Sequence, residues 1–195
     1  MFNQKKIIEF FDGLAPQWDS NMIRNEEVIS KILDGAGVSE NKKILDVACG
    51  TGVLIPDYLA RKIENVTAID ISPEMIKIAS SKYLENNIEF ICGDIMTQEF
   101  EEKFDCIMLY NAFPHFANPE ELIKKLADDL RIGGKLTIAH GMSKSEIDKI
   151  HENGASDVSL SLMEAEELAM LMNKYLEVEV KISDDKMYQV TGRKV

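Results

Sequence analysis

Short apolar runs alternate with amphipathic stretches along most of the chain, and this alternation predicts strands and helices in turn. The apolar runs lie at residues 44–47, 66–70, 91–95, 104–109 and 136–138. Because strands that alternate with helices form a parallel sheet covered on both faces, the pattern predicts a doubly wound α/β fold. Residues 176–182 and 188–194 alternate between apolar and polar positions, so they predict a final antiparallel hairpin.

Amphipathic stretches predict two helices near the amino terminus, at residues 4–11 and 26–33, and a third at residues 53–63 after the first strand. Ser72 and Pro73 predict the start of another helix after the second strand. Serine accepts a hydrogen bond from the backbone at a helix start, and proline fits the first helical turn.

Two serine and glutamate pairs predict further helices near the carboxyl end. Ser143 with Glu146, and Ser161 with Glu164, have the spacing of a capping box, in which the two side chains bond backbone amides at a helix start. In the second of these helices, three apolar residues are expected to face inward: Leu168, Leu171 and Met172.

Residues 43–54 place a buried strand, a glycine turn and a helix start within a dozen positions. Gly50 and Gly52 permit positive φ and the close approach of a ligand, because neither carries a Cβ. The second apolar run ends in Asp70, eighteen residues after Gly52 (70 − 52). A carboxylate at this place can accept hydrogen bonds from both hydroxyls of a ribose, so the segment predicts a nucleotide-binding loop.

Two ligand classes use such a loop, dinucleotides and S-adenosylmethionine. A dinucleotide fingerprint starting at Gly50 needs a small third residue, and this chain has Ile55 there. Asp46 would repel a pyrophosphate but suits the ammonium of a methionine moiety. The run Asp46-x-x-x-Gly50-x-Gly52 resembles motif I of class I S-adenosylmethionine-dependent methyltransferases. An NAD-type nucleotide-binding oxidoreductase and a non-catalytic S-adenosylmethionine-binding module remain as alternatives.

The resemblance covers most of the chain. Residues 69–75, 91–95 and 104–111 resemble motifs II, III and IV, and residues 130–138 resemble the glycine pair with the fifth strand. It implies a Rossmann-like seven-stranded sheet, mostly parallel with an antiparallel carboxy-terminal hairpin and helices on both faces. It also implies a single methyltransferase domain over residues 1–195, with a helical insertion at residues 141–175.

The resemblance assigns roles to single residues. Asp70 would hold the ribose, and Ile71 would pack on the adenine. Asp94 would accept from the adenine amino group, while the amide of Ile95 would read the ring. The full set of cofactor-binding residues implied is Asp46, Ala48, Gly50, Gly52, Asp70, Ile71, Met75, Asp94, Ile95, Asn111, Ala112 and Trp18. Ala48 and Cys49 replace the glycines of the commonest motif I.

Residues 10–19 resemble the Phe-Asp-x-x-Ala-x-x-Trp-Asp motif of methyltransferases like those of quinone biosynthesis. This resemblance implies a helical lid over residues 1–36, in which Trp18 and Phe11 would exclude water from the reacting centre. The alternative is an amphipathic helix whose aromatic side chains pack on the core.

The charge balance narrows the choice of methyl acceptor. The net charge is −12, and lysines are dispersed among acids rather than gathered in a basic track. Nucleic acid substrates require such a track, so we expect a small-molecule methyl acceptor. Residues 111–114 also lack the Asn/Asp-Pro-Pro-aromatic signature of amino-group methyltransferases, although a basic protein substrate stays open.

Apolar runs and cysteines bear on the cell compartment. The chain has no apolar run of the roughly 18 residues that would span a membrane and no signal-like amino terminus. Cys49, Cys92 and Cys106 lie at or within expected strand ends, where free buried thiols are usual. We therefore expect a cytoplasmic protein, a monomer or homodimer, that binds neither membrane nor nucleic acid.

The chain has three histidines, His115, His140 and His151, and each is expected beyond the carboxyl end of the fourth or fifth strand. Ligands of doubly wound sheets bind at this edge, so the histidines would face the acceptor. One hypothesis is a divalent metal bound by all three imidazoles. A second is that His115 or His140 acts as a general base, and a third is that all three are structural.

Overall fold

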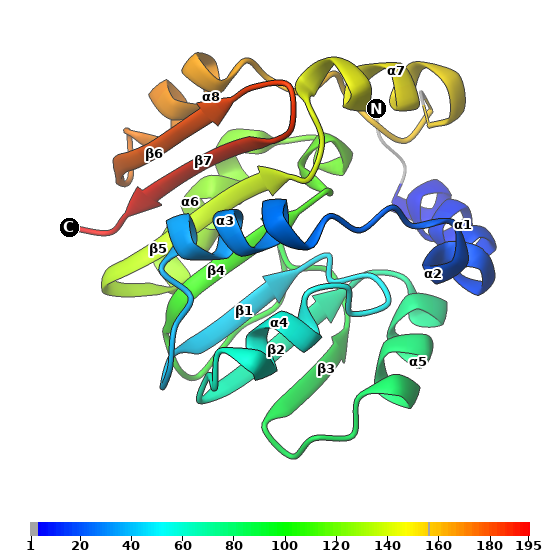
Figure 1. Ribbon diagram of the computed structural model, residues 1–195, viewed down its shortest axis with the longest axis horizontal. Helices are drawn as coiled ribbons and strands as arrows, with labels where there is room; N and C mark the ends of the chain where they lie inside the picture. The colour runs from blue at the N-terminus through cyan, green and yellow to red at the C-terminus, as the bar shows by residue number, and fades with distance from the viewer. Residues whose placement is uncertain (1–3, 156) are drawn as a thin grey trace.

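The computed structural model describes residues 4–155 and 157–195, and for residues 151–153 the backbone alone. A seven-stranded sheet in the order β3-β2-β1-β4-β5-β7-β6 forms its centre (Figure 1). β7 pairs antiparallel with β5 and β6, and the other pairs are parallel, which confirms the predicted fold. The strands are β1 (Lys43–Val47), β2 (Asn65–Asp70), β3 (Ile88–Cys92), β4 (Phe104–Tyr110), β5 (Leu130–His140), β6 (Glu177–Ser183) and β7 (Tyr188–Arg193).

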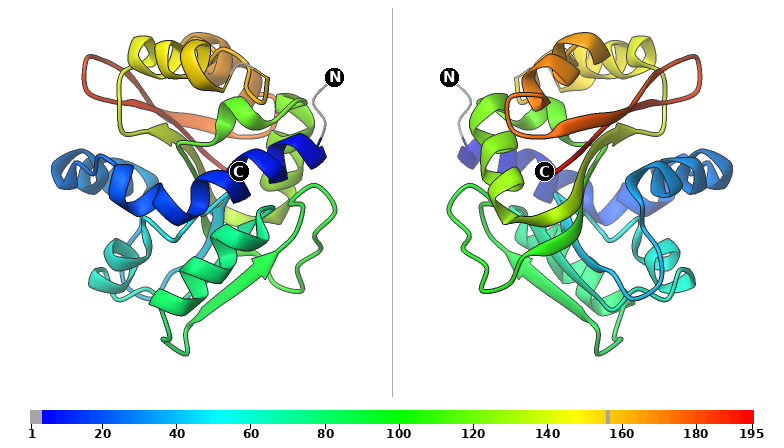
Figure 2. Two further views of the ribbon diagram at one scale, coloured as in Figure 1. Left: turned by 90° about the vertical axis from the view of Figure 1, so that its right-hand side faces the viewer. Right: turned by 90° about the vertical axis from the view of Figure 1, so that its left-hand side faces the viewer.

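Helices cover both faces of the sheet (Figures 1 and 2). They are α1 (Gln4–Leu14), α2 (Trp18–Asn21), α3 (Glu26–Ala36), α4 (Ile55–Ala60), α5 (Pro73–Lys82), α6 (Pro119–Asp129), α7 (Lys144–Gly154) and α8 (Ala165–Met172), with 3-10 turns η1 (Ala15–Gln17) and η2 (Phe113–His115). Successive residues of β1 point to opposite faces. Ile44 packs with α3 and α4, whereas Leu45 and Val47 pack with α6 and α8.

Side-chain caps fix several helix ends as expected. The Ser72 hydroxyl accepts from the amide of Met75 at the start of α5. Ser143 and Glu146 form the predicted box before α7, with the Ser143 amide donating to Glu146 Oε2 at 3.1 Å. These bonds satisfy amides that have no partner within the helix.

Two predicted helix boundaries are wrong. α4 is shorter than residues 53–63, because the glycine turn continues to Leu54 and Lys62 has a positive φ of 54°. α8 begins at Ala165, so Ser161 does not cap it. Glu164 is itself the N-cap and forms a capping box with Glu167, because the sequence repeats the box spacing three residues later.

α1 and α2 lie beyond the carboxyl ends of β1, β2 and β4 (Figures 1 and 2). α3 instead packs on the sheet and buries Val28, Ile29, Ile32, Leu33 and Ala36. Of the helices described within residues 4–36, α1 and α2 lie where a lid is expected, whereas α3 does not. Cys49 and Cys106 are buried thiols, whereas Cys92 is exposed on the edge strand, contrary to expectation. None of the described helices is both long and apolar enough to cross a membrane.

Candidate active site

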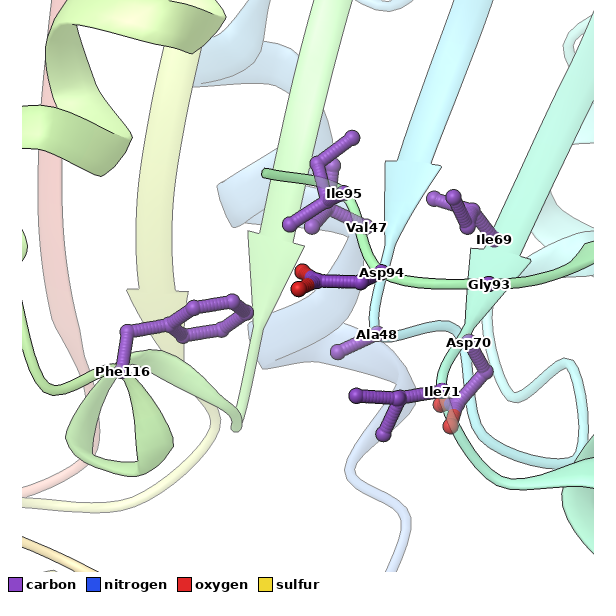
Figure 3. A pocket seen from close by; sticks show the side chains of 9 residues that line it. All are labelled: Val47, Ala48, Ile69, Asp70, Ile71, Gly93, Asp94, Ile95 and Phe116. Atoms are coloured by element: carbon purple, nitrogen blue, oxygen red, sulfur yellow. The ribbon is translucent and has the colours of Figure 1, made fainter. Parts of the chain in front are cut away.

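A cavity lies where β1, β2 and β3 end, and Phe116, which directly follows η2, closes it from the β4 side (Figure 3). The residues that line it are Val47, Ala48, Ile69, Asp70, Ile71, Gly93, Asp94, Ile95 and Phe116. Five of them, Ala48, Asp70, Ile71, Asp94 and Ile95, were expected from the sequence to bind the cofactor. The cavity is at the strand ends where doubly wound sheets bind their ligands.

The loop after β1 has a backbone that only a few residue types adopt readily. Gly50 and Gly52 have φ of 55° and 84°, and Ala48 also has a positive φ, of 54°. A Cβ on Gly52 would stand 2.8 Å from the ring of Tyr83. Glycine at this position is therefore favoured both by backbone conformation and by the close approach of Tyr83, which follows α5.

Asp70 joins the first loop to the second. Its Oδ2 accepts from the amide of Gly50 at 2.8 Å, and its Oδ1 accepts from the amide of Ser72 at 2.9 Å. The side chain is 8% exposed, and this burial raises its pKa although the backbone amides act in the opposite direction. A carboxylate fixed in this way keeps its remaining lone pairs at the cavity wall.

Asp94 projects into the cavity toward Phe116, with Ile95 on one side and Ala48 and Ile71 on the other (Figure 3). Its Oδ1 accepts from the amide of Met96 at 2.9 Å. Apolar walls around the Asp94 carboxylate suit a flat ring that carries a polar edge. Phe116 was not found by sequence reasoning, because it lies outside every motif. The one sequence feature that points to it is its place directly after His115, which was expected beyond the fourth strand.

Asp46 and Met75 are among the expected cofactor residues that do not line this cavity. Asp46 points to the face covered by α3 and α4 and is 2% exposed, and Met75 is buried in α5 at 1%. Burial, together with the nearby charge of Asp70, raises the pKa of Asp46 to about 8. Spacing along the chain gave the position of Asp46 but not the direction of its side chain.

The ends of β4 and β5 are tied together by Asn111. Its Oδ1 accepts from the amide of Gly141 at 3.0 Å, and its own φ is 55°. A Cβ on Gly141 would clash with the Tyr110 hydroxyl, so a larger residue here requires the Tyr110 ring to move. Ala112 is buried in the core beside them, and neither it nor Asn111 lines the cavity.

The described histidines lie in different surroundings. His115 is half-buried in η2, with Nδ1 2.9 Å from the carbonyl oxygen of Val158 and its ring 5.0 Å from that of Phe11. His140 is 2% exposed, and its ring lies 6.0 Å from that of Tyr188 on the neighbouring strand.

The side chain of His151 lies outside the described residues. Among the side chains that the structure describes, no group of three histidine, cysteine or acidic residues is placed to bind a metal ion. His140 is packed within the sheet, away from the open position that a catalytic metal needs. The hypothesis of a metal held by three imidazoles therefore gains no support.

The segment formed by α1, η1 and α2 is bonded to the loops after β1, β2 and β3. Asp12 accepts from the Ser72 hydroxyl at 2.5 Å, after β2. Asp19 accepts from the Thr51 hydroxyl at 2.5 Å, in the loop after β1. Trp18 lies with its ring 5.9 Å from that of Phe11, and its indole nitrogen is near Gly50.

Comparisons with known sequences agree with this geometry. Residues 44–134 match a family model described as a methyltransferase domain. A relative from Acetivibrio thermocellus, named malonyl-[acyl-carrier protein] O-methyltransferase, is 33% identical over 139 residues, which are 69% of this chain and 49% of the relative. A relative from Xanthomonas axonopodis pv. citri, named ubiquinone biosynthesis O-methyltransferase, is 32% identical over 155 residues, which cover 71% of this chain and 61% of the relative. The chain spans about half to three fifths of the length of these curated relatives.

A solved structure shows the same fold. The N-methyltransferase NodS from Bradyrhizobium japonicum WM9, in complex with S-adenosyl-L-homocysteine, matches with a TM-score of 0.74 at 15% identity, covering 98% of each chain. Residues 44–134, which match the methyltransferase family model, contain the glycine loop, Asp70, Asp94 and the strands that position them. The chain belongs to the class I S-adenosylmethionine-dependent methyltransferase family.

Proposed function

We propose that the protein transfers a methyl group from S-adenosylmethionine to an oxygen atom of a small-molecule acceptor. The observation that supports this most directly is the cavity at the strand ends. Residues expected to hold a ribose and an adenine, namely Asp70, Ile71, Asp94 and Ile95, line it together.

The residues present fit the adenosine part of the cofactor. The carboxylate of Asp70 would accept from the ribose hydroxyls, and that of Asp94 would accept from the adenine amino group. Ile71 and Ile95 would pack on the faces of the base, and Phe116 would close the far wall. When bound, S-adenosylmethionine supplies an electrophilic methyl group on a sulfonium. The chain's main contribution is then to position the acceptor, which can be worth roughly 7 to 11 kcal/mol.

We assign the role of general base to His115. The carbonyl oxygen of Val158 accepts from Nδ1, so the neutral ring carries its proton there and its lone pair on Nε2. An imidazole in this tautomer can take the proton of an acceptor hydroxyl at Nε2. The second candidate, His140, is packed against Tyr188 within the sheet, which supports a structural role.

An oxygen acceptor is supported by the printed names of both curated relatives, each an O-methyltransferase. The net charge of −12 and the dispersed lysines support a small molecule over a nucleic acid. Three free thiols support a reducing, cytoplasmic location. We keep the expectation of a monomer or homodimer, which sedimentation velocity measures directly.

We propose that α1 and α2 act as the lid. Phe11 lies against His115, and Trp18 lies beside the glycine loop, so both rings would flank the space between a bound cofactor and the acceptor. Apolar rings in this place would exclude water from the reacting atoms. The bonds of Asp12 and Asp19 to the cofactor loops would hold the lid closed.

The test is a transfer assay with S-adenosylmethionine that carries a labelled methyl group. Phenols, carboxylic acids, thiols and amines of small size are offered in parallel, and the labelled atom is located by NMR. We expect label on oxygen and stoichiometric formation of S-adenosylhomocysteine. Label on nitrogen or sulfur would contradict the oxygen assignment. Binding of NADH, seen as a change in nicotinamide fluorescence, without binding of S-adenosylhomocysteine would favour the oxidoreductase alternative.

A further inference from the structure

The lid reaches the adenine side of the cavity through Gln4. Its Nε2 donates to Oδ2 of Asp94 at 2.9 Å, across ninety positions of sequence. The other oxygen of Asp94 accepts from the amide of Met96. The Asp94 carboxylate is therefore held from two sides, and each oxygen keeps a second lone pair directed elsewhere.

Contacts along the whole of α1, in addition to this bond, place Gln4 at the edge of the cavity. Asp12, two turns further along α1, accepts from the Ser72 hydroxyl and also from the Glu74 amide at 3.3 Å. Phe11 packs its ring against His115. Residues 4, 8, 11 and 12 share one face of a helix. This face of α1 is therefore turned toward the cofactor loops along its length.

We propose that Gln4 is a specificity residue for the purine base and that it reads the exocyclic amino group together with Asp94. This inference rests on the proposed use of S-adenosylmethionine. An amino group offers two hydrogens. Asp94 would accept one, and the amide oxygen of Gln4, whose nitrogen is already bonded to Asp94, is the nearby acceptor for the other. A 6-oxo purine presents an oxygen in the same place, which the Asp94 carboxylate repels.

The lid thus has a share in base recognition, in addition to covering the site. Sequence reasoning missed Gln4 because the contact joins the first described residue to a loop after the third strand. The resemblance of residues 10–19 to a known motif begins six positions later. A carboxamide is well suited to this task, since it presents a donor and an acceptor side by side.

The experiment compares two ligands by isothermal titration calorimetry. One is S-adenosylhomocysteine, and the other is its 6-oxo analogue, S-inosylhomocysteine. In the unaltered protein we expect the analogue to bind about thirtyfold more weakly, because the partly buried carboxylate of Asp94 loses a donor and faces an oxygen. In Gln4→Ala we expect that ratio to fall by about fivefold, since the hydrogen bond from the amino group to the neutral amide oxygen is worth about that factor in affinity, while Asp94 keeps its share of the discrimination.

Two further variants separate base recognition from lid anchoring. Gln4→Leu keeps most of the bulk of the side chain and should lose selectivity as Gln4→Ala does. Gln17→Ala removes another exposed glutamine of the lid, which makes no side-chain bond to a cofactor loop among the described residues, and should keep the full ratio.

Each result decides the inference. If Gln4→Ala weakens both ligands equally and the ratio stays, Gln4 only anchors the lid and the inference is overturned. An unaltered protein that binds both ligands equally well overturns it too. If the unaltered protein binds neither ligand, the proposed function fails, and this inference fails with it.

Discussion

The amide of Gly50 donates to Oδ2 of Asp70 at 2.8 Å, so the residue expected to hold the ribose also ties together the loops after β1 and β2. Oδ1 of the same carboxylate accepts from Ser72 at the start of α5. One side chain therefore holds the backbone of both loops. Asp70 therefore links the expected ribose binding to the stability of the loops after β1 and β2.

Replacing Asp70 with alanine should abolish binding of S-adenosylhomocysteine. It should also lower the free energy of unfolding by roughly 1 to 3 kcal/mol, because two buried amides lose their acceptor. Calorimetry measures the first effect, and urea denaturation measures the second. Asp185→Ala, at an exposed turn position between β6 and β7, is the control and should change neither. Unchanged affinity in Asp70→Ala would remove the ribose assignment.

The buried carboxyl of Asp46 should make stability depend on pH. Its pKa is about 8 in the folded protein against an ordinary 3.8, so the folded chain keeps a proton that the unfolded chain releases. The contribution of Asp46 to the free energy of unfolding is therefore fully present below pH 4 and is lost as the pH rises toward 8. Asp46→Asn should remove this loss.

The measurement is urea unfolding of both proteins at pH 5, 6 and 7. We expect the variant to gain about 1 kcal/mol relative to the unaltered protein for each pH unit, close to the limit of about 1.4 kcal/mol for one proton. A difference that does not change with pH would mean that Asp46 is ionised in the folded protein.

Loss of the imidazole at His115 should lower turnover more than cofactor affinity. His115→Ala and His115→Gln should reduce kcat by about 100-fold or more, since a positioned general base typically contributes 10²- to 10⁴-fold. The dissociation constant of S-adenosylhomocysteine should change by no more than about threefold, the scale of a lost contact worth well under 1.4 kcal/mol. A variant with full turnover would show that His115 is structural.

A methyl group added at Gly52 should be costly. Gly52→Ala has to accept a φ of 84° and a Cβ 2.8 Å from the Tyr83 ring, so we expect a loss of roughly 1 to 3 kcal/mol in unfolding free energy. Adding Tyr83→Ala should restore only part of this, because the backbone strain remains. Gly13→Ala is the matched control: it lies in α1 with nothing within 4 Å of the new Cβ and should stabilise by about 0.5 to 1 kcal/mol. Equal stability of Gly52→Ala and the unaltered protein would contradict this account.

Local patterns in the sequence were sufficient for the order of elements and for the two loops that contain Gly50 and Asp70. The glycine spacing and the polar strand ends are short-range signals, and the sheet topology follows from alternation. The direction of Asp46 was missed, although it shares a strand face with Ile44, which packs under α3 and α4. The start of α8 was missed because Ser161, Glu164 and Glu167 repeat the capping spacing, and only the fold selects between them.

Contacts between distant segments could not be predicted in the same way. Gln4 bonds to Asp94, and His115 bonds to the carbonyl of Val158, across 90 and 43 positions. No periodicity or motif connects such pairs. They depend on where α1 and the segment after α7 come to lie over the strand ends, which the packing of the whole domain decides.

The position of Gln4 has a practical consequence for anyone who prepares this protein. A purification tag fused ahead of α1 would be joined within a few residues of Gln4, whose side chain bonds to Asp94 at the cavity. The carboxyl terminus lies at the opposite end of the sheet from α1 (Figure 1). Every titration described above is best made with the tag placed there, or with an amino-terminal tag removed by a protease before measurement.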